Sequence, residues 1–207
     1  MDKKAMYKLS YGLFVVTSEL DGRFNGCISN TAMQVTTEPN QIVIAINKTN
    51  LTHDYMLASN KFNVSILSQD ADFSLFRHFG FQSGRDVDKF ADFHDYRRSG
   101  NGLPYITSGT NAWMSCWVDR TVDLGTHTLF IAMVTDAEVL SKTPSCTYEY
   151  YLTDIKPKPQ KTGSASQGKT IWRCRICGYE YEGEELPADF ICPICKHPAS
   201  DFEKVIV

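Results

Sequence analysis

Four cysteines near the end of the chain have the spacing of a metal site. Cys174 and Cys177 form one Cys-x-x-Cys pair, and Cys192 and Cys195 form a second pair. Each pair places two thiolates about one tetrahedral edge apart, so that together they can hold one metal ion. A segment as short as residues 169–207 buries too little apolar surface to fold without such a staple. The spacing alone leaves a structural zinc ribbon open beside an iron centre.

The residues around these cysteines resemble rubredoxin, in the short version that ends rubrerythrins. Gly178 follows the first pair, as is usual in rubredoxins, whereas Lys196 stands where a second glycine is usual. The resemblance implies one iron held by four cysteines, which carries one electron at a time and does no other chemistry. It also implies a small aromatic core made of Trp172, Tyr179, Tyr181, Phe190 and Phe202.

A change of composition separates this small domain from the rest of the chain. Residues 155–169, "IKPKPQKTGSASQGK", begin with a Pro-Lys-Pro stretch and continue with glycine and serine. The first part favours an extended chain and the second a flexible one. The sequence therefore predicts a domain at residues 1–155, a flexible linker at 156–168 and the metal domain at 169–207.

The long domain is rich in strand patterns. β-branched or alternating apolar residues predict strands at 11–19, 41–47, 61–67 and 126–141, the last being one long strand or two consecutive ones. Asp21-Gly22 is a hairpin turn signal. Helix-compatible stretches occur at 51–60 and 70–80, and Gly80 occupies a C-cap position. The predicted fold class is mainly β, a barrel-like domain with short helices outside it.

Three stretches of this domain resemble the flavin reductase family. They read "DGRFNGCISNTAMQVTTEP" (21–39), "VIAINKTNLTH" (43–53) and "FGFQSGRDVDKF" (79–90). The glycine motifs of dinucleotide-binding and phosphate-loop folds are missing from the sequence, which disfavours a Rossmann dehydrogenase. The resemblance covers roughly residues 5–155 and implies an FMN-binding split β-barrel.

With its metal domain, the whole chain is similar to the high-molecular-weight rubredoxins. That similarity implies that FMN takes electrons from NAD(P)H and passes them through the iron to a redox partner such as a flavodiiron protein. It also implies a homodimer that builds the FMN site across its two-fold interface. Since the flavin itself accepts the hydride, no catalytic side chain is assigned.

The first stretch supplies candidates for the pyrimidine edge of the flavin. A run of small and polar residues predicts a strand and turn whose backbone N–H groups face the cofactor. A solvated hairpin is the alternative for this run. The candidate cofactor-binding residues here are Asn25, Gly26, Cys27, Ile28, Ser29, Asn30 and Thr31.

The second stretch ends a strand and opens a helix, a position suited to phosphate. Asn50 is the predicted N-cap, and free amides at a helix N-terminus bind anions. Lys48 adds a positive charge, Thr52 adds a hydroxyl, and Asn47 precedes both. His53 would be a neutral donor and acceptor at the cofactor or nicotinamide. The alternatives are simple capping with a solvated Lys48, and a surface position for His53.

The third stretch is predicted to be a flexible loop, which in the family lies over the flavin. Ser83, Arg85 and Lys89 are its candidate cofactor-binding residues. The two cations would balance charge on the reduced flavin or on the nicotinamide phosphates. A surface network of these cations with Asp86 and Asp88 is the alternative.

Charge and composition bear on the partners and the location of the protein. The net charge of −3 and the absence of a basic block argue against nucleic acid as a partner. The first residues contain an apolar run too short for a signal-peptide core or a membrane span, so a cytoplasmic protein without a membrane partner is expected. The isolated Cys27, Cys116 and Cys146 read as buried small hydrophobes. A reductase of free flavin with an incidental tail, or a non-catalytic flavin-binding module with a zinc ribbon, remain alternative functions.

Overall fold

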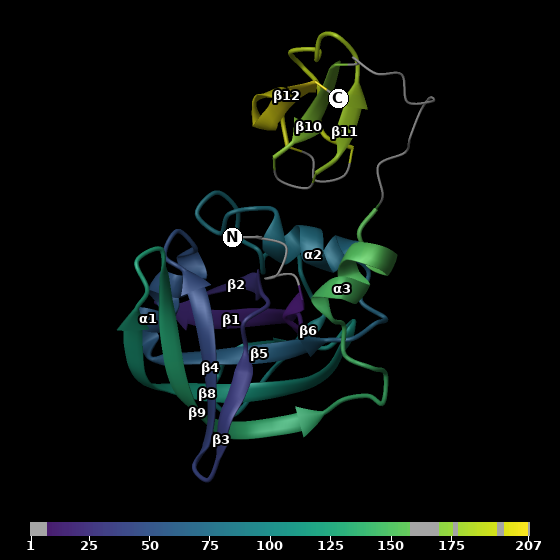
Figure 1. Ribbon diagram of the computed structural model, residues 1–207. Helices are drawn as coiled ribbons and strands as arrows, with labels where there is room; N and C mark the ends of the chain where they lie inside the picture. Colours follow the sequence, from purple (N-terminus) through teal and green to yellow (C-terminus); the bar gives the residue numbers. More distant parts are fainter. Residues whose placement is uncertain (1–7, 158–169, 176–177, 194–196, 207) are drawn as a thin grey trace. The chain divides into compact units, whose positions relative to one another are not determined.

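The computed structural model describes residues 8–157, 170–175, 178–193 and 197–206. The chain divides into two compact units, Met1–Ile155 and Lys156–Val207. The first is a curled antiparallel sheet with short helices against it, and the second is built on a small sheet of its own (Figure 1). This confirms the predicted mainly β fold class. None of the helices in the described ranges is long and apolar enough to cross a bilayer.

The first unit contains nine strands and three short helical elements within its described residues. The strands are β1 (Phe14–Leu20), β2 (Arg23–Ser29), β3 (Met33–Thr37), β4 (Asn40–Asn47), β5 (Lys61–Leu67), β6 (Tyr96–Arg98), β7 (Pro104–Ile106), β8 (Thr110–Asp123) and β9 (His127–Val139). The helices are α1 (Leu51–Ser59), α2 (Phe73–Gly80) and α3 (Tyr148–Tyr150), the last continued by a π-helical turn at Tyr151–Ile155.

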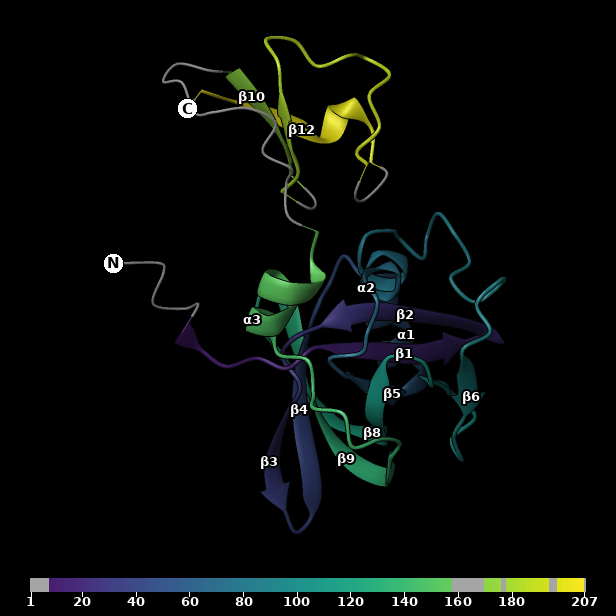
Figure 2. The same ribbon diagram turned by 90° about the vertical axis from the view of Figure 1, so that its right-hand side faces the viewer.

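Seven of these strands form one sheet whose two edges are joined by a very short connection. The strand order is β2-β1-β5-β8-β9-β4-β3, so β2 and β3 lie at opposite edges. Yet only residues 30–32 connect the end of β2 to the start of β3. Three residues span about 10 Å when fully extended. The sheet must therefore curl until the end of β2 comes close to the start of β3. From there β2 and β3 diverge at a steep angle (Figure 2), and we call this parting of the two edges the split of the barrel.

Apolar side chains fill both faces of the curled sheet. Alternate residues of β4, namely Ile42, Ile44 and Ile46, join residues of β1, β5, β8 and β9 in one core cluster. A second cluster joins Val15 of β1 to the aromatic residues of α2 and of the chain after it. Successive strand residues point to opposite faces, so Val15 and Val16 contribute to different clusters. Helix α2 thus covers the outside of the barrel next to β1 and β2.

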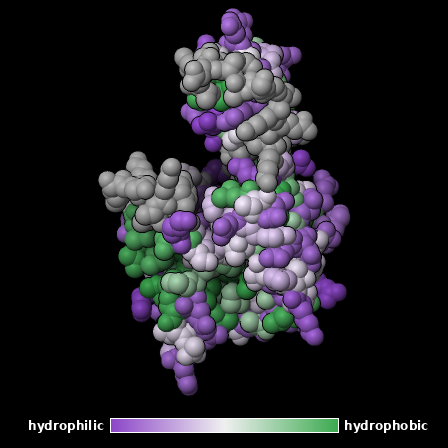
Figure 3. Space-filling model, turned by 45° about the vertical axis from the view of Figure 1, so that its right-hand side comes forward, coloured by the Kyte–Doolittle hydropathy of each residue, from purple (hydrophilic) through white to green (hydrophobic). Residues whose placement is uncertain are grey.

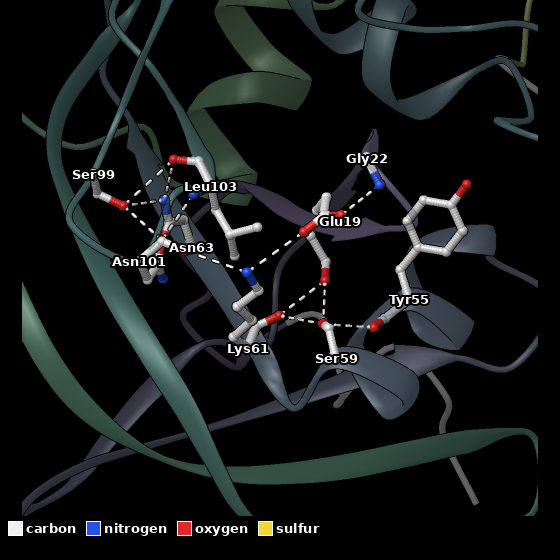
Figure 4. A network of polar contacts seen from close by, with 10 residues as sticks. Glu19, Gly22, Tyr55, Ser59, Lys61, Asn63, Ser99, Asn101 and Leu103 are labelled. Carbon is white, nitrogen blue, oxygen red and sulfur yellow. Dashed lines mark hydrogen bonds and ion pairs between the residues drawn. The ribbon is translucent and has the colours of Figure 1, made fainter.

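One buried amide fixes the β6–β7 hairpin to the barrel wall (Figure 4). The Nδ2 of Asn63 on β5 donates to the Ser99 hydroxyl and to the carbonyls of Leu103 and Pro104. Its Oδ1 accepts from Asn101 and from Ser115 of β8. Buried polar groups need such partners. The hairpin is therefore held by hydrogen bonds as much as by packing.

The sequence patterns located most elements of this unit and missed others. Asp21 and Gly22 both have positive φ, as a tight hairpin turn requires, and the 126–141 pattern is one strand, β9. The C-cap assignment of Gly80 is wrong, because Gly80 is the last helical residue and Phe81 is the cap. The 14-residue β8 was not predicted, since its charged and apolar residues lack a clear alternation.

The second unit is a three-stranded antiparallel sheet. Its strands are β10 (Thr170–Cys174), β11 (Glu180–Glu182) and β12 (Phe202–Ile206), with β10 in the middle, and a 3₁₀ turn at Ala199–Asp201 precedes β12. Aromatic rings contact one another on this sheet. Phe190 lies 4.8 Å from Tyr181, 5.4 Å from Phe202 and 6.4 Å from Tyr179 between ring centroids. The ammonium of Lys204 lies over the Trp172 ring, 5.9 Å from its centroid.

Candidate flavin and metal sites

The split of the barrel brings the end of β2 beside the end of β4. The Thr31 hydroxyl donates to the Ala45 carbonyl at 2.9 Å and accepts from the Ala45 N–H at 3.0 Å. The Ser29 hydroxyl lies 3.1 Å from that of Thr31 and can bond it. The Thr31 side chain therefore bonds the Ala45 backbone as a neighbouring strand would. This holds residues 29–31 against β4, the strand that leads into α1. Two of the three stretches found in the sequence meet here.

Helix α1 begins a short turn after β4, and no side chain caps its N-terminus, although the N–H of His53 donates to the Asn50 carbonyl at 3.1 Å. Asn50 occupies the N-cap with extended backbone angles, as predicted, but its side chain makes no capping hydrogen bond. Asn47 instead accepts from the N–H and hydroxyl of Thr49, which shapes the turn before the helix. Because the first N–H groups of a helix have no partner within it, an anion can take the place of the missing cap.

Lys48 stands at the same helix end, in an ion pair with Asp123. The distance from its Nζ to Oδ1 of Asp123 is 2.7 Å, and both side chains are exposed to solvent. This contact also lowers the pKa of Asp123. Exposed ion pairs contribute little to stability because water and salt screen them. The ammonium can therefore leave Asp123 for a more highly charged group at little cost.

The middle of β2 is joined to α1 rather than exposed to solvent. Asn25 is buried, and its Nδ2 donates to the hydroxyl of the fully buried Thr52 at 2.9 Å. Cys27 is buried as well, and burial raises the pKa of its thiol, against smaller opposite effects of the Thr52 hydroxyl and Lys89. The side chains of Asn25, Cys27 and Thr52 are thus internal supports. Their burial gives no support to cofactor binding through these three side chains.

A chain of polar contacts connects the loop after α2 to the start of α1. Arg85 donates to Oδ2 of Asp54 at 2.7 Å, and Oδ1 of Asp54 lies 3.0 Å from Nδ1 of His53. The other ring nitrogen of His53 contacts the Thr128 hydroxyl at 2.8 Å. Burial raises the pKa of Asp54, but the hydrogen bonds from His53 and Arg85 outweigh it and hold the pKa below its usual range. His53 is buried, so the surface alternative does not apply.

The loop residues themselves are held against β2. Arg23 donates to the carbonyl of Gly84 at 2.9 Å, and a Cβ on Gly84 would stand 2.1 Å from Oδ1 of Asn25. The Ser83 hydroxyl accepts from the N–H of Arg85. Lys89 is buried and donates to two backbone carbonyls, so the surface network with Asp86 and Asp88 does not describe it.

A hollow of about 530 Å³ opens next to Asn30, with walls from segments that the sequence motifs did not include. The chain before β1 pairs there with the start of α3, where the Tyr148 N–H donates to the Tyr11 carbonyl. Hydroxyl, amide, aromatic and aliphatic groups all line it, which suits a planar heteroaromatic ligand. The wall residues are Lys8, Leu9, Ser10, Tyr11, Asn30, Thr147, Tyr148, Glu149, Leu152 and Thr153.

A flavin needs donors and acceptors for its pyrimidine edge, a partly apolar face and an anion site for its phosphate. The split offers the outer backbone edge of β2, the adjoining hollow offers ring-sized space, and α1 offers an N-terminus without a side-chain cap beside Lys48. The residues present therefore fit this group. The sequence analysis did not identify Asp54, Tyr11 or Tyr148 as site residues. Of the three, only Asp54 had a local signal, as an acidic residue in the first turn of a predicted helix.

The second unit builds two matching cysteine turns. The N–H of Cys174 donates to the carbonyl of Tyr179, and the N–H of Cys192 donates to the carbonyl of His197, each five residues along and each at 2.8 Å. Gly178 in the first turn has a φ of +76°, a backbone conformation that favours glycine at this position. Cys174 and Cys192 are both buried. Cys177, Cys195 and Lys196 lie outside the described residues.

These turns suit a tetrahedral thiolate site. Each begins with one buried cysteine and is closed by a hydrogen bond from that cysteine's N–H to a carbonyl five residues along. Four thiolates are the donor set of both rubredoxin iron and structural zinc. The four cysteines, two of which begin these turns, therefore supply a donor set that fits a single ion.

Comparison with known proteins assigns both units. The family model described as "Flavin reductase like domain" matches residues 6–156, and the one described as "Rubrerythrin, rubredoxin-like domain" matches residues 172–203. The chain belongs to the flavin reductase family, as a member that carries a rubredoxin-like domain at its C-terminal side. Its flavin reductase-like unit and its relatives support a flavin-dependent oxidoreductase.

Relatives share either the whole architecture or the barrel. The high molecular weight rubredoxin of Moorella thermoacetica is 39% identical, over 99% of this chain and all of its own. The ferric-chelate reductase (NAD(P)H) of Archaeoglobus fulgidus is 39% identical over 79% of this chain and 96% of its own. Among solved structures, the flavin reductase PheA2 is 32% identical with a TM-score of 0.60, covering 71% of this chain and 93% of its own.

Proposed function

We propose that this protein oxidises NAD(P)H with a bound FMN and delivers the electrons one at a time to an iron held by Cys174, Cys177, Cys192 and Cys195. The observation that carries the proposal is the presence in one chain of a flavin reductase barrel and two matching cysteine turns. When bound, FMN supplies a centre that accepts two electrons together and releases them singly, and the iron supplies a one-electron carrier. A redox protein, such as a flavodiiron protein, is the proposed acceptor.

The residues of the barrel bind and orient in this proposal; none transfers a proton. The N-terminus of α1, which has no side-chain cap, and the ammonium of Lys48 bind the FMN phosphate. The free edge of β2 and the Asn30 side of the hollow position the ring. The Arg85–Asp54–His53 chain holds the loop after α2 against α1 and so fixes the position of that loop.

Anaerobic titration tests the proposed electron path. Protein purified with its cofactors should show the visible bands of flavin and of ferric iron with four thiolates. NADH or NADPH should bleach both, with an end point at about 1.5 equivalents per chain, because FMN takes two electrons and the iron takes one. Metal analysis of the same sample should give about one iron per chain.

Two outcomes would contradict this path. Stoichiometric zinc after growth with ample iron would remove the one-electron carrier, leaving a flavin protein with a structural ribbon. Bleaching of the flavin with iron that stays ferric would favour reduction of a diffusible acceptor. The Archaeoglobus fulgidus relative, a ferric-chelate reductase, makes a ferric chelate the acceptor to try in that case.

We also propose that a second copy of the chain covers strand β3. All five residues of β3 are exposed, and β3 is the free edge of the sheet on the far side of the split. Beside it lies a groove of about 280 Å³, lined largely by apolar side chains that include Met33, Met114 and Val134. Apolar residues also gather on the barrel face seen in Figure 3. Monomers rarely leave a sheet edge and an apolar groove exposed together.

Sedimentation of a β3 variant tests this dimer. Val35→Glu places a charge on β3, so we expect the wild-type dimer to become a monomer and to lose FMN, since the split lies at this edge. Leu57→Glu on α1 is the matched control, because Leu57 and Val35 are equally exposed, at 44%. A wild-type monomer, or a Val35→Glu dimer, would show that β3 is not the interface.

A further inference from the structure

Lys89 is a buried cation without a carboxylate partner. Only 4% of the residue is exposed, and its ammonium donates to the Gly26 carbonyl at 2.8 Å and to the Phe79 carbonyl at 2.9 Å. No carboxylate oxygen lies within 4 Å of this ammonium in the part of the chain that the structure describes. Burial lowers its pKa to about 8. A fold keeps such a costly group only where its hydrogen bonds are needed.

Both acceptors of Lys89 are carbonyls without a regular partner. Phe79 lies in the last turn of α2, where carbonyls lack intrahelical donors and the helix dipole is negative. Gly26 lies on β2, an edge strand, so that a carbonyl on its outer side has no neighbouring strand. The ammonium satisfies both groups and joins the helix end to the strand edge. The backbone of Lys89 is fixed too, because its carbonyl lies 2.7 Å from Nε2 of His78.

Strand β2 and the end of α2 are in tight contact at this point. A Cβ on Gly26 would stand 3.0 Å from the Phe79 ring and 3.2 Å from the Val16 carbonyl. A Cβ on Gly80 would stand 3.2 Å from the Ile28 side chain. The position of β2 at residues 26–28 is therefore set by α2, and Lys89 is the polar bond between them.

The outward carbonyl of Gly26 determines which backbone groups of β2 face the split. Gly26 is paired with Thr17 and Ile28 with Val15 in the antiparallel β1–β2 ladder. Because outward and inward groups alternate along such a strand, the N–H and C=O of Ile28 share the outer edge with the Gly26 carbonyl. The Ile28 groups lie two residues closer along the chain to Asn30, which lines the hollow.

We propose that Lys89 is a positioning residue of the flavin site: by bonding the Gly26 carbonyl to the end of α2, it fixes the outer edge of β2, whose peptide groups at Ile28 bond the pyrimidine edge of FMN. Lys89 itself does not touch the cofactor. This inference rests on the proposed function, and it gives the loop after α2 a role different from charge balance at the flavin.

Three variants and FMN itself test the inference. Lys89→Met keeps the length of the side chain and removes its donors, Lys89→Arg keeps a donor cation, and Lys61→Met is the control. Lys61, on β5, also donates to a backbone carbonyl and lies partly buried; it bonds neither Gly26 nor Phe79, and its ion-pair partner is Glu19 of β1 (Figure 4). Binding is followed by quenching of FMN fluorescence, the bound flavin by its absorption spectrum, and folding by thermal melting.

We expect Lys89→Met to weaken FMN binding at least about tenfold, a loss typical of one misplaced charged-group contact, and to change the spectrum of FMN that remains bound. Lys61→Met should lower the melting temperature while leaving FMN affinity within about twofold. Lys89→Arg should restore much of the affinity. Folded Lys89→Met that binds FMN as the wild type does, with the same spectrum, would overturn the proposal. A wild type that binds no FMN would instead contradict the proposed function.

A pH series keeps the inference testable if Lys89→Met fails to fold. Wild-type FMN affinity should fall several-fold between pH 7 and 9 as Lys89 loses its proton, whereas Lys89→Arg should hold its affinity across this range. The groups that face the ammonium are the Cys27 thiol, whose pKa burial raises, and the two carbonyls. Identical pH profiles for the two proteins would show that the Lys89 charge does not act on the site.

Discussion

Cutting the chain between its two units should slow reduction of the iron about 100-fold at ten micromolar protein, because a short tether corresponds to an effective concentration on the order of millimolar. The experiment introduces a protease site within residues 158–169 of the complete protein, between the two matched family regions. One sample, loaded with FMN and iron, is then compared before and after cleavage. Stopped-flow absorption separates flavin reduction from iron reduction.

The cut should change only one of the two steps. Oxidation of NAD(P)H with a small artificial acceptor should keep its rate, because the barrel has its own core and its own candidate flavin site. Iron reduction should become second order in the released rubredoxin-like unit. The uncut protein with the same inserted site is the control. If cleaved and intact samples reduce the iron at the same rate, the iron is not served by its own flavin unit, and the small unit takes its electrons elsewhere.

Two substitutions at the end of α1 should shift FMN affinity in opposite directions. Lys48→Met should weaken FMN binding about 10- to 100-fold, the usual loss when a charged donor to a phosphate is removed. Asp123→Asn should instead strengthen binding about two- to fivefold, because Asp123 holds the Lys48 ammonium at 2.7 Å and competes with the phosphate for it. Fluorescence titration with FMN measures both.

Controls separate this local effect from general charge. Lys142→Met removes an equal charge from an exposed position after β9 and should leave affinity unchanged. Riboflavin, which lacks the phosphate, should bind wild type and Lys48→Met equally. A Lys48→Met protein that keeps its FMN affinity, or an Asp123→Asn protein that binds FMN less tightly, would place the phosphate away from α1.

Local chemistry made part of this molecule predictable. The Cys-x-x-Cys spacing and Gly178 predicted the small unit, and the structure places Gly178 at positive φ in the first cysteine turn. Strong apolar alternation predicted β4 and β5 to within a residue at either end. Asn50 was predicted as the N-cap of α1 because a polar residue follows a strand and precedes a helical pattern. Each of these signals lies within a few residues of the element that it predicts.

The rest depends on contacts between distant residues, which no local pattern contains. Lys89 reads as a surface cation in a loop flanked by aspartates, yet it ends 2.8 Å from a carbonyl 63 positions earlier in the chain. The partner of Arg85 is Asp54 rather than the neighbouring Asp86. Tyr11 and Tyr148 share a hollow only because the chain ends of the barrel pair with each other. Such groupings follow from the closure of the sheet, and the sequence order conceals them.

The Asn63 network has a consequence for how this fold can diverge. The Asn63 amide on β5 satisfies polar groups from the β6–β7 hairpin and from β8, so replacing any one partner leaves buried polar atoms unpaired on the other segments. We therefore expect substitutions at positions 63, 99, 101 and 115 to occur together. Gly100, at the hairpin tip, has open space around it and is free to drift alone. Related sequences should thus vary at position 100 of the hairpin while keeping the four residues of the Asn63 network together.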